Sequence, residues 1–426
     1  MPFSRTNRRT SAWLGLSLVL ALATAACGGS EGGSSSSGPL KVGMAVAFSG
    51  DAAFLGPNLK KGADVALAEI DAAGGVNGSD VQFVTADTGS SAEGATTAVQ
   101  KLLKQDDVDA LIGPTSVTIL SVLSRIQASK VPDMVIASTS ALDDAIKGET
   151  TFRATPSDTE QGPAEAYAAY SHGARDCAIV AESLEGAQSI SANVKRAFEG
   201  LGGQITREIN VATDQSSYRS EILKLVQPPL PDCVFYEISP GSAGQWWQDA
   251  SEFSQTYDML WMGNDVSLNE DAIKTMKPVE SKLDFIAIAP AAIGPGRDDY
   301  VSAYQKKYPD AKEPVVLSDL AYDAMNLLAL AAEKAGSTDQ QAIADNIVAV
   351  SRQGAACTNF ADCKKLLDDG KDINYEGASG SADISDNGNS VSGYGVFKIA
   401  HDHSVQTGQI SQDQMEKVLD EVGVSI

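Results

Sequence analysis

The chain has 426 residues, of which 43% are hydrophobic, 32 are basic and 56 are acidic, giving a formal net charge of −24 at pH 7. A surface this acidic argues against nucleic acid and anionic lipid headgroups as partners, because both would repel it. The length is sufficient for two domains of about 100–200 residues, each with its own hydrophobic core.

Residues 1–26 have the features of a lipoprotein signal peptide. Three arginines lie within the first nine residues, an apolar run covers residues 13–23, and two alanines precede Cys27. The apolar run is too short for a membrane span and is typical of an export signal. Cys27 directly after small residues resembles the lipobox of bacterial lipoproteins, although Thr24 stands where that pattern prefers an aliphatic residue. An ordinary signal peptide with a chance cysteine is the alternative.

Residues 27–39 are almost entirely glycine and serine, which is the composition of a flexible tether. A lipid on Cys27 followed by this tether would hold a folded body at the outer face of the cell membrane. No later run of the sequence is apolar over the ~20 residues that a membrane span requires.

The other four cysteines predict two disulfides in an oxidising compartment outside the cytoplasm. Cys177 and Cys233 each begin a short apolar segment predicted to be a strand, and strands of successive βαβ units often lie side by side. Cys357 and Cys363 are near enough in sequence to close a short loop. A zinc site is the alternative, but the C-x-x-C spacing is absent and the three histidines of the sequence lie in unrelated segments.

Short apolar strands alternate with helices from residue 40 onward. The alternation predicts helices over residues 58–73, 92–104 and 119–129, and strands over residues 41–48, 81–86, 110–112 and 134–137. Gly74 and Gly75 end the first of these helices. This order is typical of a parallel doubly wound sheet, in which ligands bind beyond the carboxyl ends of the strands.

A second series of the same kind begins near residue 176. It predicts helices over residues 187–201 and 218–225, and strands over residues 177–181, 204–209, 233–238, 259–262 and 285–289. A helix over residues 317–335 and a strand near residues 394–399 follow. Two such series without a glycine-rich phosphate loop predict an α/β protein of two Rossmann-like lobes, with a first crossover near residues 152–156.

Several short motifs, taken in order, are shared with a known family. They are FSG at 48–50, GA at 62–63, AEIDAAGGVNG at 68–78, ADT at 86–88, LIGP at 111–114, VP at 131–132, STS at 138–140, FRATPSD at 152–158 and AYDA at 321–324. The ordered set resembles the branched-chain amino-acid-binding proteins, which are type I periplasmic solute-binding proteins of ABC importers. The resemblance covers residues 40–399.

The resemblance implies the type I periplasmic binding protein fold, with two lobes joined by a multi-strand hinge. We expect lobe 1 over residues 40–155 and 290–370, and lobe 2 over residues 156–289 and 371–426. Such a hinge favours closure of the lobes over their free movement.

The resemblance also implies a function. The lobes would close around a small polar molecule, an amino acid or an analogue, and the protein would deliver it to an ABC permease and ATPase complex. No cofactor or metal ion is expected. Catalysis is not expected either, because no nucleophile, base and orienting acid can be assembled from the sequence. Residues 383–388 begin like a calcium loop, but Tyr394 stands where the closing glutamate should be. Two alternatives stay open, a ligand sensor of the same fold acting on a membrane receptor and a secreted enzyme.

In the family, lobe 1 holds the charged end of the ligand with loops that follow its strands. A buried carboxylate needs N–H or O–H donors, and an ammonium needs acceptors. The corresponding candidates are Ser116, Thr118, Ser138 and Thr139. The position of the usual family serine in the first loop is occupied here by Val117. Ser116, one residue earlier, is therefore the candidate for its role. The same hydroxyls could instead cap helices.

In lobe 2 the candidates are Glu185, Ser239 and Asp265. Glu185 stands where the family has an aromatic residue that covers the ligand, and a carboxylate there favours a ligand with a positive or hydroxyl-rich side chain. A solvated loop carboxylate is the alternative. Asp265 matches an acidic family position that pairs with the ligand ammonium, and Ser239 follows a strand whose end points into the cleft.

Overall fold

The structure is a computed structural model that describes residues 38–290, 295–380, 382–390, 392–400 and 403–424. The predicted signal peptide, Cys27 and the predicted tether up to residue 37 lie outside the described residues. Within the described ranges, no helix has the length and apolar character needed to cross a membrane.

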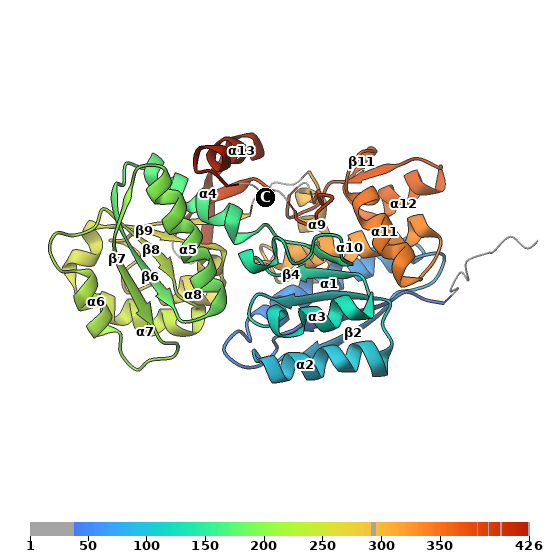
Figure 1. The fold of residues 1–426 in the computed structure, drawn as a ribbon, viewed down its shortest axis with the longest axis horizontal. Coiled ribbons are helices and arrows are strands. Elements are labelled where there is room, and N and C mark those ends of the chain that lie inside the picture. Colours follow the sequence, from blue (N-terminus) through green and yellow to red (C-terminus); the bar gives the residue numbers. More distant parts are fainter. Residues whose placement is uncertain (1–37, 291–294, 381, 391, 401–402, 425–426) are drawn as a thin grey trace, which may run out of the picture. The chain divides into compact units, whose positions relative to one another are not determined.

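Five parallel strands form the first sheet, in the order β2-β1-β3-β4-β5 (Figure 1). They are β1 (Lys41–Val46), β2 (Gln82–Asp87), β3 (Ala110–Thr115), β4 (Asp133–Ile136) and β5 (Thr151–Arg153). β3 and β4 are buried along their whole length, as expected for central strands of a parallel sheet covered on both faces. We call this sheet and the helices packed on it lobe 1.

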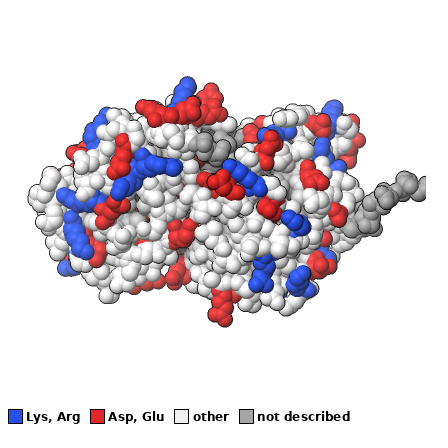
Figure 2. Space-filling view, in the orientation of Figure 1, with Lys and Arg blue, Asp and Glu red and all other residues white. Residues whose placement is uncertain are grey.

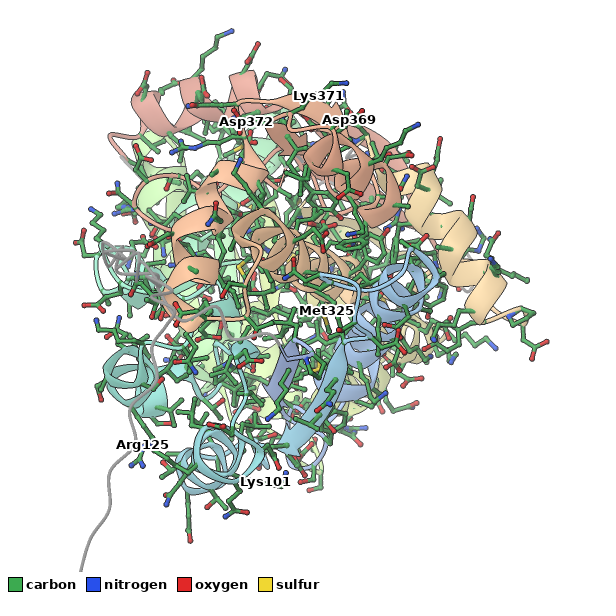
Figure 3. The ribbon with its side chains drawn as sticks, turned by 90° about the vertical axis from the view of Figure 1, so that its right-hand side faces the viewer. Lys101, Arg125, Met325, Asp369, Lys371 and Asp372 are labelled. Carbon is green, nitrogen blue, oxygen red and sulfur yellow. A yellow bond between two sulfur atoms is a disulfide. The ribbon has the colours of Figure 1, made fainter. Side chains whose placement is uncertain are left out.

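Helices cover both faces of the first sheet. On one face, α2 (Ala92–Lys101) and α3 (Ile119–Ser129) share an apolar cluster with the strands, and the exposed Lys101 and Arg125 lie on their outer side (Figure 3). On the other face lie α1 (Leu55–Ala72) and α10 (Ser318–Ala335). A Cβ at Gly62 of α1 would lie 1.6 Å from the Ser318 carbonyl oxygen, so the close approach of these two helices requires glycine.

The remaining elements of lobe 1 pack around α10, whose Met325 is fully buried (Figure 3). They are α9 (Arg297–Lys307), α11 (Gln340–Ser351), α12 (Phe360–Asp368) and the parallel pair of β11 (Ala355–Cys357) and β12 (Ile373–Tyr375). Asp323 of α10 accepts hydrogen bonds from the backbone N–H groups of Ala378 and Ser379, at 2.9 and 2.7 Å. The segment after β12 is therefore fixed to α10. The lobe boundaries expected from the sequence stay a proposal.

Seven strands form the second sheet, in the order β14-β13-β10-β9-β8-β6-β7. The parallel strands are β6 (Asp176–Glu182), β7 (Gln204–Val211), β8 (Cys233–Glu237), β9 (Leu260–Gly263) and β10 (Asp284–Pro290). β13 (Tyr394–Ala400) and β14 (His403–Ile410) add an antiparallel edge. We call this sheet and its helices lobe 2.

Helices also cover both faces of the second sheet. One face carries α4 (Asp158–Ser171), α5 (Glu185–Gly200) and α13 (Gln412–Glu421). The other carries α6 (Arg219–Leu225), α7 (Pro240–Ala250) and α8 (Glu270–Thr275). Short helical turns are η1 (Leu102–Asp106), η2 (Ser140–Leu142), η3 (Ser254–Asp258) and η4 (Asp265–Leu268). The two sheets confirm the predicted α/β fold with two Rossmann-like lobes.

Both predicted disulfides are present. Cys177 and Cys233 are directly paired residues of the neighbouring strands β6 and β8, and their sulfur atoms are 2.04 Å apart. Cys357 of β11 and Cys363 of α12 are joined across 2.09 Å. These four cysteines therefore form no zinc site, and the described residues contain no cluster of three or more potential metal ligands.

The face of the molecule in Figure 2 carries acidic and basic side chains interspersed over both lobes. Many of the basic groups on the described surface are paired, such as Lys60 with Asp64 and Lys195 with Glu208. The excess of acidic residues is consistent with the expectation that nucleic acid is not a partner.

Candidate ligand-binding site

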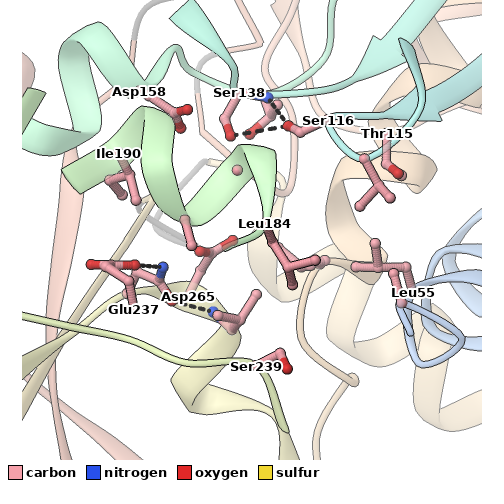
Figure 4. A pocket seen from close by; sticks show the side chains of 18 of the residues that line it. Leu55, Thr115, Ser116, Ser138, Asp158, Leu184, Ile190, Glu237, Ser239 and Asp265 are labelled. Atoms are coloured by element: carbon pink, nitrogen blue, oxygen red, sulfur yellow. Dashed lines mark hydrogen bonds between the residues drawn. The ribbon is translucent and has the colours of Figure 1, made fainter. Parts of the chain in front are cut away.

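A cavity of about 160 Å³ lies between the two lobes, at the carboxyl ends of their parallel strands (Figure 4). Its lining comes from the loops after β1, β3, β4 and β9, the last residues of β6 and β8, and the first turns of α4, α5 and α10. The carboxyl edge of parallel sheets is where open α/β folds bind ligands. A cavity below the ~300 Å³ of drug-sized sites suits a small molecule.

Hydroxyl groups dominate the polar part of the lobe 1 wall. Thr115, Ser116 and Ser138 line the cavity, and the backbone N–H of Ser138 donates to the Ser116 hydroxyl at 3.0 Å. Gly113 positions this loop, because its φ of +80° is left-handed and a Cβ there would lie 2.7 Å from the Ala45 carbonyl oxygen. The hydroxyl of Thr115 is buried and has no hydrogen-bond partner among the described residues. This wall therefore offers O–H donors to a ligand.

Carboxylates dominate the polar part of the lobe 2 wall. Glu182 is the last residue of β6, Glu237 is the last residue of β8, and Asp158 is the first residue of α4. Their exposed fractions are 0, 2 and 2%, respectively. The Ser239 N–H donates to Glu182 at 3.0 Å, and the Asn264 amide donates to Glu237. One carboxylate oxygen of each of the three acids accepts no hydrogen bond from an amide or hydroxyl group of the described residues.

Burial alters the titration of Asp158 and Glu237. It raises the pKa of Asp158 to about 7, against the opposing effects of the Ser138 and Ser189 hydroxyls and the Arg153 charge. Burial also raises the pKa of Glu237 well above its usual value, and the neighbouring Glu165 of α4 adds to this effect. The pKa of Glu165 is itself raised by burial to about 8. Two carboxyl groups in hydrogen-bonding contact share a proton, so part of this acidic cluster is neutral near pH 7.

Four of the seven predicted ligand residues line the cavity. They are Ser116 and Ser138 in lobe 1 and Ser239 and Asp265 in lobe 2 (Figure 4). Asp265 is partly buried, burial raises its pKa, and one of its oxygens accepts a hydrogen bond from the Gln161 amide at 3.4 Å.

The other three predicted ligand residues lie outside the lining. Thr118 is buried at the start of α3, and its hydroxyl has no partner. The Thr139 hydroxyl donates to the Glu185 carboxylate at 2.5 Å, so these two side chains contact each other across the lobes. The ligand roles of Thr118, Thr139 and Glu185 stay predictions.

The sequence analysis did not select Asp158, Glu182 or Glu237. Glu182 directly follows the predicted strand 177–181, and Glu237 lies inside the predicted strand 233–238. An acidic residue at the carboxyl end of an otherwise apolar strand is the signal that could have identified both. Asp158 lies in the FRATPSD motif, which contributed to the resemblance to the family and to no ligand prediction.

Two α/β lobes with a small polar cavity between the carboxyl ends of their strands define a solute-binding protein. The model of the family described as periplasmic binding protein matches residues 39–371. The chain belongs to this family, as a type I member of the Leu/Ile/Val-binding group, which confirms the resemblance seen in the sequence.

Three comparisons illustrate the relationship. The chain is 24% identical over 389 residues to the chemotactic signal transduction system substrate-binding protein BasB of Halobacterium salinarum, covering 87% of this chain and 89% of BasB. The crystal structure of the leucine-binding protein LivK of Thermotoga maritima superposes with a TM-score of 0.73 and 24% identity, covering 88% of this chain and 99% of LivK. A solute-binding protein of an ABC transporter from R. palustris in complex with benzoate gives a TM-score of 0.72 and 18% identity, covering 88 and 97% of the two chains.

Proposed function

We propose that the protein captures a small polar molecule, an amino acid or an analogue, between its lobes and delivers it to an ABC permease and ATPase complex. The observation that carries this proposal is the cavity itself, with hydroxyl donors on one wall and carboxylate acceptors on the other. Ser116 and Ser138 would donate to a ligand carboxylate, and Asp265 would accept from a ligand ammonium. Ser239 lies on the Asp265 side and would add a further hydroxyl.

Lobe closure is part of this proposal. The Thr139–Glu185 hydrogen bond and the contacts of Ser140 with the Ser189 hydroxyl, at 3.3 and 3.4 Å, join the two lobes beside the cavity. A ligand that contacts both walls would favour the state in which these interlobe bonds form. Closure would also exclude water, which strengthens the polar contacts inside.

We propose that the protein acts outside the cytoplasm, held at the outer face of the cell membrane by a lipid on Cys27. The lipobox-like sequence before Cys27 and the Gly/Ser segment after it support this location. The two disulfides support it as well, because disulfides persist in oxidising compartments.

A ligand sensor is the second candidate function. It is favoured by the similarity to BasB, whose name describes a substrate-binding protein of a chemotactic signalling system. In that case the closed, ligand-bound form would contact a membrane receptor instead of a permease. Uptake of radiolabelled ligand by cells with and without the gene separates the two candidates, because loss of a sensor leaves uptake unchanged.

A thermal-shift screen tests the binding function. The purified protein would be heated with amino acids, amides, sugars and aromatic acids in turn. A ligand present at 100 times its Kd adds about 2.7 kcal/mol to the stability of the folded state, which a melting curve resolves. An amino acid among the stabilising compounds supports the proposal, and stabilisation by sugars alone contradicts it.

A further inference from the structure

The cavity is lined by more acidic groups than one ligand ammonium can neutralise. Among its described lining residues are the carboxylates of Asp51, Asp158, Glu182, Glu237 and Asp265, and none is Lys, Arg or His. Asp265 alone would serve an amino-acid ammonium under the proposed function. The deeply buried acids Glu182 and Glu237 are then left without a function.

Hydrogen bonds within the protein do not saturate these two acids. Glu182 accepts from the Ser239 N–H and Glu237 accepts from the Asn264 amide, and no other amide or hydroxyl group of the described residues donates to the second oxygen of either carboxylate. Glu237 also shares a proton with Glu165, and a ligand cation would replace that proton. A buried carboxylate oxygen without a donor is costly, so its presence at a cavity wall points to a donor supplied by a ligand.

No Lys, Arg or His among the described lining residues takes this place. The fully buried Arg153 is the positive charge that acts on Asp158, but its guanidinium is bound to Asp143 at 2.8 Å, to Asn389 at 2.9 Å and to backbone carbonyls. The charges that act on Glu237 come from acidic groups. Arg153 is therefore committed to other partners and is not a counter-ion of Glu237.

Apolar side chains lie between the acidic groups of the cavity. Leu55, Ile136, Leu184 and Ile190 belong to the same lining as Glu237 and Asp265 (Figure 4). Such a surface suits methylene groups. The combination of apolar walls and buried acceptors therefore fits an alkyl chain that carries positive charge.

We infer that the ligand carries a second cationic group in addition to the one held by Asp265, with Glu182 and Glu237 as its acceptors and a short alkyl chain between the two. This inference rests on the proposed function of the same cavity and specifies its ligand class. A basic amino acid and an aliphatic diamine share this chemistry. Only the amino acid also has a carboxylate, which Ser116 and Ser138 would bind.

Calorimetric titration of the purified protein tests the inference with matched compounds. L-norleucine has the alkyl chain of L-lysine without the terminal amine, and cadaverine has both amines without the carboxylate. We expect L-lysine or L-ornithine to bind at least about tenfold more tightly than L-norleucine. Binding of cadaverine as tight as that of L-lysine also supports the inference and identifies the ligand as a diamine.

Two other outcomes overturn the inference, and they separate it from the proposed function. If L-norleucine or L-leucine binds at least as tightly as L-lysine, L-ornithine and cadaverine, the inference is wrong and the proposed function stands. If none of these compounds binds, both the inference and the amino-acid part of the proposed function are wrong.

The variants Glu182→Gln and Glu237→Gln show whether these residues hold the cation. Glutamine has the shape of a neutral carboxyl group, so each variant should weaken L-lysine binding by about tenfold or more and leave norleucine binding unchanged. Glu416→Gln, at an exposed acid of α13, is the matched control. Circular dichroism melting checks that each variant folds. If a variant does not fold, the comparison of L-lysine with L-norleucine on the parent protein still tests the inference. Unchanged lysine affinity in both folded variants overturns the assignment.

Discussion

Thr139 and Glu185 form a direct bond between the two lobes, 2.5 Å from the threonine hydroxyl to the glutamate carboxylate. Thr139 follows β4 in lobe 1, and Glu185 begins α5 in lobe 2. Neither side chain lines the cavity, but Leu184 and Gly186 on either side of Glu185 do. The pair is therefore placed to stabilise the closed arrangement of the lobes from beside the cavity.

We expect Thr139→Val to weaken ligand binding by about 1–2 kcal/mol, or roughly five- to thirtyfold in Kd. The substitution keeps the shape of the side chain and removes the hydroxyl that reaches Glu185. Because the contacts to the ligand stay in place, the change should appear as faster dissociation in stopped-flow fluorescence. Thr97→Val, at an exposed position of α2, is the control. Identical dissociation rates in the parent and Thr139→Val would show that the bond does not stabilise closure.

Asp265→Asn should weaken the binding of an ammonium-bearing ligand by about 2–5 kcal/mol, because a buried cation would lose its charged acceptor. A neutral analogue of the same size should lose little affinity. Calorimetric titration of both compounds into the parent and the variant measures this difference. Equal losses for the charged and the neutral compound would assign Asp265 a structural role only.

Removing the disulfide between Cys177 and Cys233 should destabilise lobe 2. The double substitution to alanine opens a loop of 56 residues, which costs about 2–4 kcal/mol of unfolding free energy. The bond between Cys357 and Cys363 spans only 6 residues, so its removal should cost less. Urea unfolding of the two double variants compares them. A larger loss for the short loop would contradict the chain-entropy argument.

The stability of the unliganded protein should fall as the pH rises from about 5 to about 8. Burial raises the pKa of Asp158 to about 7 and those of Glu160 and Glu165 to about 8, from 3.8, 4.5 and 4.5. The folded state therefore binds these protons more tightly than the unfolded state, and its advantage is lost as the groups ionise. Thermal unfolding at a series of pH values tests this, and a midpoint that rises steadily from pH 5 to pH 8 would contradict it.

The affinity for a cationic ligand should change with pH in the opposite direction. A positive charge favours ionised carboxylates, so binding should release protons from Asp158 and the Glu165–Glu237 pair and tighten as the pH rises to about 8. Calorimetry of L-lysine in buffers with different ionisation enthalpies counts the released protons. Proton uptake on binding would be incompatible with a cationic ligand.

The sequence predicted most of the fold because the signals of its elements are local. Residues 119–129 were predicted as a helix and form α3, and residues 110–112, predicted as a strand, form the first half of β3. β5 was not predicted as a strand, because a short segment that contains the charged residue Arg153 is typical of a loop. The segment was interpreted as the crossover between the lobes. Arg153 is buried through Asp143, Asn389 and two backbone carbonyls, and Asn389 lies 236 residues further along the chain. Partners at that distance leave no local pattern.

The site was predicted only in part for a similar reason. Ser116, Ser138, Ser239 and Asp265 line the cavity, and the resemblance to the family together with their positions after predicted strands pointed to them. The contact of Glu185 with the hydroxyl of Thr139, 46 residues earlier, leaves no pattern in the sequence and is seen only in the tertiary structure. A ligand role of Glu185 stays a prediction.

The lipid anchor has its own test. Cys27→Ser should leave an unprocessed or released precursor with a folded body, because lipid attachment requires the cysteine thiol. Metabolic labelling with a fatty acid and membrane fractionation compare the parent with the variant. Equal labelling of both would show that Cys27 is not the lipid attachment site.

The most direct test of the whole account is a crystal structure of the protein bound to the compound that stabilises it most in the thermal-shift screen. The account predicts that this compound lies between the lobes, that Ser116 or Ser138 donates to it, and that Asp265 with Glu182 or Glu237 accepts from its cationic groups. A ligand bound outside this cavity, or one that contacts a single lobe and no carboxylate, would contradict the account.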